Sequence, residues 1–149
     1  MEAHMDHYTR DNFSLTQSVG FAINKARNLL VAEVDTALKD LGITSQQMGI
    51  LLSMRGGVTA TPFELSKLLG IDTGLMTRML DKLEDKGLLE RSRSLEDRRV
   101  VNLNLTVQGE ELAARLPDIV PVVLNARLKK FTKSEFKELR RLLYKFLED

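Results

Sequence analysis

The sequence predicts a mainly α-helical fold that carries one small β-hairpin. Three observations support this prediction. Apolar residues recur at helical spacing in six segments. Capping residues and glycines mark where most of these segments begin and end. Residues 88–105 instead alternate between apolar and polar side chains, in two runs joined by a charged turn.

The composition is that of a soluble globular chain. The 149 residues suffice for one domain with a sizeable core, with 43% hydrophobic and 29% charged residues. No apolar run approaches the roughly 20 residues that cross a membrane. The polar segment 1–12 lacks the apolar region of a secretory signal. A cytoplasmic location is therefore expected.

Cysteine usage and charge exclude several functions. Cysteine is absent, so disulfides, thiolate zinc sites and cysteine-based redox sensing are excluded. The 22 basic and 21 acidic residues leave a net charge of +1, so any nucleic-acid binding has to depend on local charge. Segment 91–99 supplies such a charge, because its four arginines outnumber Glu96 and Asp97.

A long helix is expected over residues 12–41. Its apolar positions repeat at helical spacing, no proline interrupts it, and Gly42 follows where a left-handed C-terminal cap would lie. At about 1.5 Å per residue the helix would span on the order of 40 Å, more than a compact lobe requires. Such a helix can supply contact surface to another subunit.

Two shorter helices are expected next. Thr44 and Gln47 have the spacing of a capping box, and the helix that they begin ends at the glycine pair 56–57. Thr61 and Glu64 repeat this pattern. The proline between them suits a first helical position, because its missing N–H costs no hydrogen bond there.

A helix-turn-helix followed by a β-hairpin is expected over residues 61–105. The first helix ends near Gly70, and Asp72 caps the second. Alternation then predicts strands at 88–93 and 99–105. Together these segments outline a winged helix-turn-helix, a module that places one helix in a DNA groove and a hairpin beside it.

Two further helices complete the chain. A helix that begins at the cap Thr106 is expected to run to residue 128, and Thr132 with Glu135 forms a third capping box for the last helix. Two prolines inside the fifth helix should bend it or break it briefly. They are Pro117 and Pro121.

The predicted organisation is a single domain over residues 1–149. Segments 12–41 and 106–149 are expected to be dimerisation helices, and segment 44–105 a winged helix-turn-helix lobe that binds DNA. The end helices carry more apolar residues than one lobe can cover, so burying them requires a second copy of the chain. The excess residues are Val120, Val123, Leu124, Leu139, Leu142, Leu143 and Phe146.

The helix after Asp72 carries candidate DNA contacts on its polar face. Its apolar stripe should face the core. On the opposite face, small residues such as Thr73 and Thr77 permit close approach to base edges. Arg78 could donate two hydrogen bonds to guanine, and Lys82 could meet a phosphate. The alternative is that these charges simply solvate a surface face.

The turn between the strands is a second candidate contact. Arg98 at the hairpin tip could insert into a narrow minor groove. Asp97 is expected to hold a nearby arginine, such as Arg91 or Arg99, because a carboxylate facing DNA would be repelled by the phosphates. Arg91, Arg93 and Arg99 complete the set of arginines predicted to bind DNA. The alternative is an ordinary charged turn.

Residues 89–112, LERSRSLEDRRVVNLNLTVQGEEL, resemble the wing and following helix of the multiple antibiotic resistance regulator (MarR) family. The runs ITSQQMGIL and FELSKLLGIDTGLMTRMLDKLEDKGLLER resemble the family's second to fourth helices. The resemblance covers nearly the whole chain in the expected order. Its specific part is the Asp-Arg-Arg wing followed by Leu105-Thr106-x-x-Gly109.

The resemblance implies a homodimer that binds a pseudo-palindromic operator and usually represses nearby genes. It implies release by a small ligand, often a phenolic or an aromatic carboxylate. By position, it places Thr73, Thr77, Arg78 and Lys82 on the recognition helix and Arg98 at the wing tip. The family's oxidation-sensing branch depends on a reactive cysteine, which this chain lacks.

The resemblance also places a ligand pocket between the dimerising helices and the DNA-binding lobe. The matching positions are around Ser18 and Arg27 on the first helix, and Met48 and Leu52 on the second. Arg27 independently interrupts the apolar face of its helix, so its guanidinium needs a partner. That partner is an acidic residue in a structural salt bridge or an aromatic carboxylate ligand. Met48 and Leu52 could equally be plain core residues.

No motif indicates catalysis or a cofactor. The chain has no Ser-His-Asp set and no glycine-rich phosphate loop, and its two histidines lie in the polar N-terminal tail. A metal site formed by His4, Asp6 and His7 is the weaker interpretation, because terminal segments are often disordered. We therefore expect a transcription regulator and no enzyme. The alternatives are a winged helix that binds protein and a DNA binder without a ligand.

Overall fold

The computed structural model describes residues 5–56 and 61–149, and within them it contains six α-helices and one β-hairpin. This is the predicted fold class. Short 3₁₀ turns flank the first helix. In chain order the elements are α1 (Val19–Leu38), α2 (Ser45–Arg55), α3 (Pro62–Leu69), α4 (Thr73–Asp85), β1 (Leu89–Arg93), β2 (Val101–Leu105), α5 (Val107–Leu128) and α6 (Lys133–Leu147).

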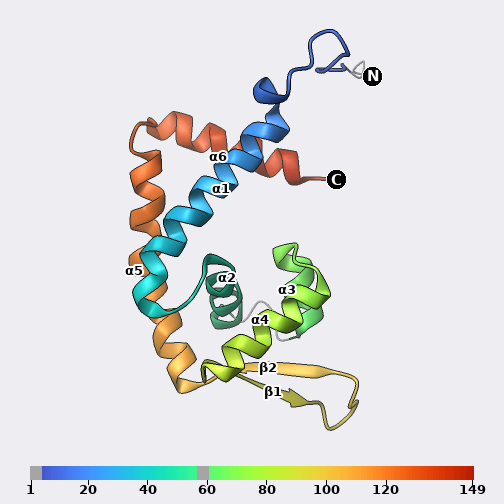
Figure 1. Cartoon of the computed structure of the whole chain (residues 1–149), viewed down its shortest axis with the longest axis vertical. Helices are drawn as coiled ribbons and strands as arrows, with labels where there is room; N and C mark the ends of the chain where they lie inside the picture. Colours follow the sequence, from blue (N-terminus) through green and yellow to red (C-terminus); the bar gives the residue numbers. More distant parts are fainter. Residues whose placement is uncertain (1–4, 57–60) are drawn as a thin grey trace.

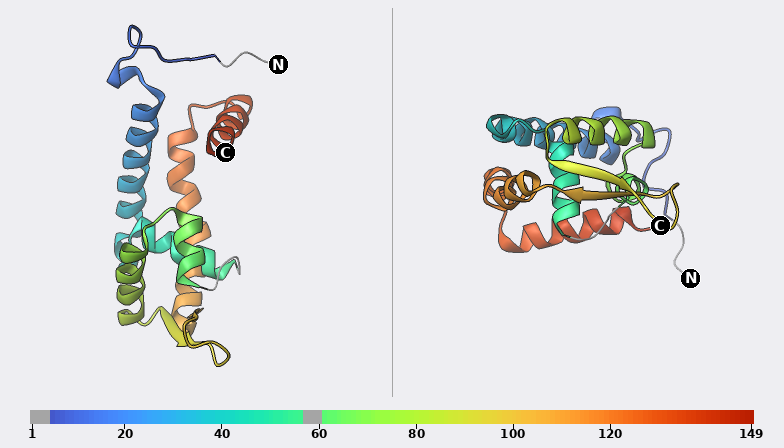
Figure 2. Two further views of the ribbon diagram at one scale, coloured as in Figure 1. Left: turned by 90° about the vertical axis from the view of Figure 1, so that its right-hand side faces the viewer. Right: turned by 90° about the horizontal axis from the view of Figure 1, so that it is seen from below.

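The elements form two groups along the long axis of the molecule (Figure 1). At one end α2, α3, α4 and the hairpin lie together, and α6 lies at the other end. The helices α1 and α5 pack against each other and join the two ends (Figure 2). Among the described residues, no helix is long and apolar enough to cross a membrane.

The first helix is shorter than the predicted 12–41. It begins at Val19, because the Ser18 hydroxyl caps it by accepting a hydrogen bond from the Phe21 backbone N–H at 3.1 Å. The segment before it folds back, and the Tyr8 hydroxyl accepts from the Val19 N–H at 2.8 Å. These bonds satisfy N–H groups that are free at a helix start. The helix therefore begins at Val19, although the apolar spacing extends to earlier residues.

The other predicted caps begin their helices. The capping boxes at Thr44 and Thr132 are complete. The box predicted at Thr61 is only half formed: its hydroxyl accepts from the Glu64 N–H, but the Glu64 carboxylate accepts from that same hydroxyl rather than from a backbone N–H. Asp72 caps α4 as predicted. Of the glycine pair that should end α2, residue 57 lies outside the described residues.

The hairpin is antiparallel and pairs Leu89 with Leu105. Its second strand begins at Val101 rather than at the predicted residue 99. The reason is the turn, in which the Arg99 N–H donates to the Asp97 carboxylate at 3.0 Å instead of joining the strand ladder.

The prolines of α5 do not break the helix, which is continuous from Val107 to Leu128. The predicted break is therefore absent. Pro117 and Pro121 are both exposed and lie four residues apart, so their rings share one solvent-facing side of the helix. A proline ring on that side can be accommodated without disturbing the core.

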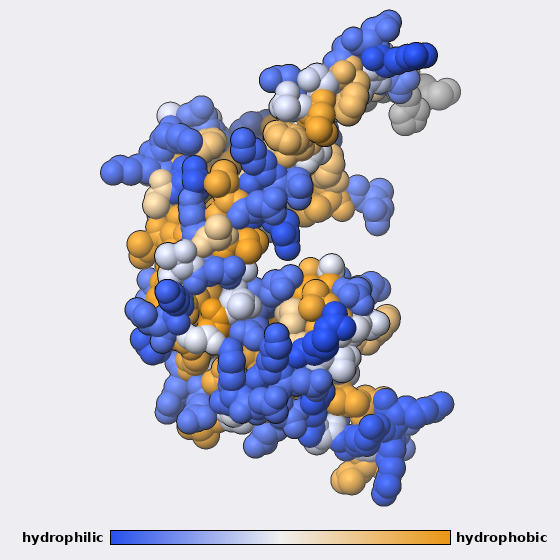
Figure 3. Space-filling model, viewed as in Figure 1, coloured by the Kyte–Doolittle hydropathy of each residue, from blue (hydrophilic) through white to orange (hydrophobic). Residues whose placement is uncertain are grey.

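One hydrophobic core joins α1 and α5 to the lobe of α2, α3, α4 and the hairpin. By contrast, α6 has no buried residue, although it carries large apolar side chains. Figure 3 shows apolar patches among the polar side chains of the upper half of the molecule, which α1, α5 and α6 build. This core therefore holds the winged lobe in place and leaves α6 largely uncovered. The fully buried large side chains are Leu38, Ile50, Leu51, Leu65, Met76, Leu80, Leu83, Leu89 and Leu116.

Candidate nucleic-acid interface

Helix α4, the expected recognition helix, has one buried and one exposed face, as predicted. Four apolar side chains on one face lie in the core, namely Met76, Met79, Leu80 and Leu83. The exposed face carries the four predicted contacts together, Thr73, Thr77, Arg78 and Lys82. The small side chains lie in the first turns, so the N-terminal end of α4 is the end that can approach a base edge closely.

The connection between α3 and α4 sets how α4 is presented. Gly70 adopts a left-handed φ of 64°, and the Ile71 N–H returns to the Ser66 carbonyl at 3.0 Å. This is the geometry of a glycine-terminated helix end, which reverses the chain within a few residues. Asp72 then starts α4 directly, so the two helices of the helix-turn-helix are held at a fixed angle.

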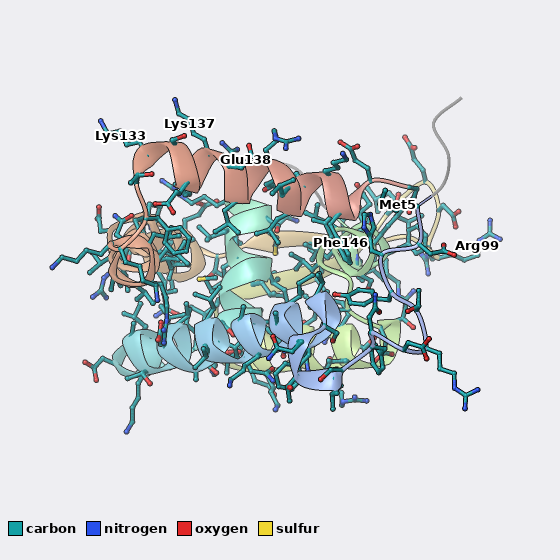
Figure 4. All side chains as sticks on the ribbon, turned by 90° about the horizontal axis from the view of Figure 1, so that it is seen from above. Met5, Arg99, Lys133, Lys137, Glu138 and Phe146 are labelled. Atoms are coloured by element: carbon teal, nitrogen blue, oxygen red, sulfur yellow. The ribbon has the colours of Figure 1, made fainter. Side chains whose placement is uncertain are left out.

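Asp97 holds the wing tip, which confirms its predicted structural role. Its carboxylate accepts from the Arg99 backbone N–H at 3.0 Å and from the Arg99 Nε at 3.1 Å. The side-chain bond, followed by the backbone bond, lowers the pKa of Asp97 below its ordinary value. The Arg99 side chain is still 91% exposed, and it projects from the molecule (Figure 4).

Arg93 crosses the hairpin toward its tip. Its Nη1 donates to the carbonyl oxygen of Arg98 at 2.7 Å, which ties the end of β1 to the turn. The Arg98 side chain is exposed and forms no ion pair with any described residue. The wing tip therefore presents two guanidinium groups to solvent, those of Arg98 and Arg99.

Arg91 connects the wing to the recognition helix. Its Nε donates to Glu84 Oε2 and its Nη2 to Asp81 Oδ1, each at 2.5 Å. The bond to Asp81 and then the bond to Glu84 raise the pKa of Arg91 above its ordinary value. The guanidinium thus faces its own protein, and the DNA contact expected of Arg91 stays a prediction.

Thr106 and Gly109 fasten the base of the wing to α5. The Thr106 hydroxyl accepts from the Gly109 N–H at 3.0 Å and donates to the Gly87 carbonyl at 2.6 Å. A Cβ atom on Gly109 would lie 1.9 Å from the Leu88 carbonyl oxygen, so only glycine fits this close approach. The Leu-Thr-x-x-Gly motif thus fixes where the hairpin leaves the helical body.

The four residues expected around a ligand pocket have separate surroundings. Ser18 caps α1, and Arg27 lies about 13 Å further along the helix. Met48 and Leu52 are partly buried against the core. Arg27 is exposed, so solvent can satisfy its guanidinium and the need for a partner inferred from its place on an apolar face does not arise. Of the two partners considered, the structural salt bridge is not formed among the described residues. The pocket stays a prediction.

The tail histidines give no metal centre that can be described. His4 lies outside the described residues, and His7 is exposed. Within residues 5–56 and 61–149 no three His, Cys, Asp or Glu side chains gather closely enough to hold a metal ion.

Comparison with known proteins places this geometry in a family. The MarR family model matches residues 43–101. The multiple antibiotic resistance protein MarR of Escherichia coli (strain K12) is 36% identical over 126 residues, which cover 84% of this chain and 85% of that protein. The chain belongs to the MarR family. Its relatives are named as transcriptional regulators rather than as enzymes, as expected.

Other members of the family agree in sequence and in structure. The organic hydroperoxide resistance transcriptional regulator of Bacillus subtilis (strain 168) is 31% identical, over 93% of this chain and 92% of that protein. A cysteine-to-serine variant of E. coli MarR, crystallised with operator DNA, matches with a TM-score of 0.81 and 33% identity. That match covers 87% of this MarR-family chain and 94% of the other.

Sequence reasoning missed two contacts that fix the winged lobe of this MarR-family chain. One is the double ion pair of Arg91. The other is Lys86, whose Nζ donates to the Gly42 carbonyl and reaches Gln47 Oε1 at 3.4 Å, so that the end of α4 is tied to the start of α2. No local pattern in the sequence indicates either contact, because their partners lie on other elements.

Proposed function

We propose that this chain is a dimeric, sequence-specific transcription regulator, and in its main role a repressor that binds a pseudo-palindromic operator. The observation that carries the proposal is the exposed polar face of α4 beside an arginine-tipped wing. Membership of the MarR family supports it, as does the likeness to MarR bound to operator DNA. A cytoplasmic location belongs to the same proposal, since its target would be the chromosome.

The charges on this surface are arranged for DNA despite the net charge of only +1. Arg78 and Lys82 are exposed on α4, and Arg98 and Arg99 extend from the wing. A helix with small residues at its N-terminal end suits the major groove, and an arginine on a hairpin tip suits a narrow minor groove. Two copies would double this local positive charge and strengthen phosphate binding.

The dimer is proposed from the apolar surface that one copy leaves open. Leu142 is 47%, Leu143 42% and Phe146 63% exposed on α6. An apolar hollow of about 380 Å³ lies between α1, α5 and α6, lined among others by Leu30, Leu124 and Leu139. We assign segments 12–41 and 106–149 to dimerisation and segment 44–105 to DNA binding. Two-fold symmetry would then set the recognition helices about 34 Å apart.

The proposed effector is a small aromatic or phenolic acid that binds between the dimerisation helices and the winged lobe. Such a ligand releases DNA only by favouring a conformation that fits the operator poorly. A tenfold loss of operator affinity requires about 1.4 kcal/mol of coupling, which one charge-assisted hydrogen bond can supply. Arg27 is the proposed carboxylate partner, because it holds the position that the family resemblance gives to the pocket and its guanidinium forms no ion pair with a described residue, so its donors are open to a ligand.

Selection from random duplex DNA tests the proposed function. The full-length chain should enrich a two-fold symmetric sequence, with an affinity that falls steeply as salt rises because counterions are released from phosphates. Arg78→Ala should weaken binding. Lys129→Ala should not, because Lys129 is an exposed residue at the end of α5, outside the winged lobe. Failure to enrich any duplex would favour the alternative of a protein-binding winged helix.

Thermal unfolding with benzoate and with phenol tests the effector. A bound acid should raise the unfolding temperature of the native chain and weaken its operator binding, because a ligand stabilises the state that it binds. Arg27→Ala should abolish both responses while DNA binding survives. If the native chain shows no response to any aromatic acid, the alternative of a DNA binder without a ligand is favoured. If Arg27→Ala fails to dimerise, Arg27 is a structural residue.

A further inference from the structure

We propose that Arg91 is a positioning residue for DNA binding rather than a DNA contact. In this assignment it locks the wing onto the recognition helix and holds two carboxylates of that helix. The proposal rests on the DNA-binding function proposed above. It gives Arg91 a role different from that of the other wing arginines, although all of them lie within nine residues of sequence.

The guanidinium of Arg91 uses two of its donors on α4 at once. Nε bonds Glu84 and Nη2 bonds Asp81, each at 2.5 Å. Asp81 and Glu84 are three residues apart, so they lie one helical turn from each other on the side of α4 that faces β1. The planar fork of arginine can serve two acceptors in fixed directions, which the single ammonium of a lysine does not reproduce.

Side-chain exposure separates Arg91 from the arginine at the wing tip. The Arg91 side chain is 29% exposed, against 91% for Arg99. A side chain that is packed between a strand and a helix cannot extend to DNA without giving up both ion pairs. Arg91 is therefore placed to hold the angle between α4 and the hairpin, on which simultaneous contact with both grooves depends.

The same contacts control the charge of the surface that faces DNA. Asp81 follows Thr77 by one turn, so it lies on the face of the proposed base contacts, and it is 50% exposed. An unpaired carboxylate there would repel the DNA phosphates. With the guanidinium at 2.5 Å from each carboxylate, Arg91 offsets one of the two negative charges of its partners and pairs with both of them. Removing Arg91 would therefore both release the wing and uncover two negative charges.

A mutant cycle on operator binding tests the proposal with the full-length chain. Arg91→Gln is made in the native chain and in an Asp81→Asn/Glu84→Gln background, and the affinity for the selected operator is measured by fluorescence anisotropy. In the native chain the change should weaken binding at least about tenfold, and in the second background less than about threefold, because coupled residues are not additive. An equal loss in both backgrounds would mean that Arg91 touches DNA and would overturn the proposal.

The dependence of affinity on salt gives a second readout that a purely structural role would not move. In the Asp81→Asn/Glu84→Gln background, Arg91→Gln should leave the slope of log affinity against log salt unchanged. The loss of a phosphate contact would instead reduce that slope by about one unit. In the native chain, Arg91→Lys should bind the operator little better than Arg91→Gln does. A lysine would instead largely replace an arginine whose only contact is with a DNA phosphate.

Arg98→Ala is the parallel control, because an exposed wing-tip arginine should lose affinity equally in both backgrounds. If changes at Arg98 and at Arg91 each cost the same affinity in both backgrounds, the positioning role of Arg91 fails while the proposed DNA-binding function stands. If the chain selects no duplex at all, the proposed function fails. Amide hydrogen exchange of β1, measured without DNA, then still tests whether Arg91 holds the hairpin against α4. Arg91→Gln and Arg91→Lys should both speed exchange of residues 89–93 in the folded protein, and unchanged exchange in both would contradict the proposal.

Discussion

At the scale of single residues, the arginines of the wing have different surroundings and therefore different roles. Arg99 extends into solvent from a backbone that Asp97 holds, while Arg93 steadies the turn by donating to the Arg98 carbonyl. Arg91 is engaged with two carboxylates of α4. An ion pair at an exposed site adds little to stability, so the value of these contacts is that they fix directions.

Removing the guanidinium at the wing tip tests the minor-groove assignment. Arg98→Ala should weaken operator binding by about 1–3 kcal/mol and leave the fold intact, because an exposed turn residue has little part in the core. Glu96→Ala in the same turn is the matched control and should not weaken binding. Unchanged affinity of Arg98→Ala, with a normal circular dichroism spectrum, would rule out the assignment.

The carboxylate of Asp97 should titrate below the ordinary value for aspartate, about 3.9. Its folded-state pKa is lowered by the bonds from Arg99, so its contribution to wing stability is present above the ordinary pKa and is lost as pH falls through the lowered one. The wing should therefore be intact at neutral pH and loosen only in acid. A carbon-detected NMR titration measures this, and Arg99→Ala should raise the pKa toward the ordinary value. Identical titration curves for the two proteins would contradict the account.

At the scale of elements, the hairpin depends on how its base meets α5. The Thr106 hydroxyl bridges the Gly109 N–H and the Gly87 carbonyl, and the Thr106 N–H bonds the Leu88 carbonyl at 3.1 Å. The start of α5, the end of β2 and the residues that follow α4 are thus bonded to one another at this point. A change here should affect the whole lobe rather than one contact.

Gly109→Ala should destabilise the folded chain by about 3 kcal/mol, at the upper end of the cost of overpacking. Its Cβ would lie 1.9 Å from a backbone oxygen, which cannot move aside as a flexible side chain can. Gly20→Ala is the control, because nothing lies within 4 Å of its Cβ and alanine favours helix, so it should be neutral or stabilising by up to about 1 kcal/mol. Chemical unfolding at one protein concentration compares them, and equal stability of the two variants would refute this role of Gly109.

Most helix boundaries could be predicted from the sequence because capping is local. Thr44, Asp72 and Thr132 act within three residues of their own positions. The start of α1 could not be predicted, because the apolar spacing begins before Ser18 and continues after it, so the spacing does not reveal that Ser18 caps the helix. The start of β2 was also missed, since a hydrogen bond from Arg99 to Asp97 draws the first residues into the turn.

The candidate site was predictable in its exposed part only. The polar face of α4 follows from the helical period of its sequence. The role of Asp97 follows from its place two residues before Arg99. The partners of Arg91 lie seven and ten residues away on another element, so their meeting depends on the packing of α4 against β1. The proposed effector pocket could not be derived from the residues, because an exposed Arg27 on a helix has the same pattern with or without a ligand.

At the scale of the whole molecule, α6 is a helix without a partner among the described residues. It has no buried residue, yet it holds an apolar face that includes Leu142, Leu143 and Phe146. Burying apolar surface stabilises by about 25 cal/mol per Å², so a second copy that covers this face would gain substantial free energy. Dimerisation and DNA reading are then joined through α1 and α5, which pass from one lobe to the other.

Charge placed on the apolar face of α6 tests the proposed dimer. The native chain should sediment as a dimer at micromolar concentration, and Leu143→Glu should shift it to monomer, because a carboxylate would have to be buried in the interface. Lys137→Glu is the control, since Lys137 projects away from the body of the molecule (Figure 4). A native chain that sediments as a monomer would exclude the dimer.

The spacing of half-sites in the selected operator tests the central claim most directly. A two-fold dimer sets its recognition helices about 34 Å apart, which is one turn of DNA. Titration of duplexes should give two chains per operator, and an insertion of about 5 base pairs, half a turn, should turn one half-site away and weaken binding by two orders of magnitude or more. One chain per duplex, or an affinity that ignores the insertion, would contradict a dimeric DNA-reading regulator.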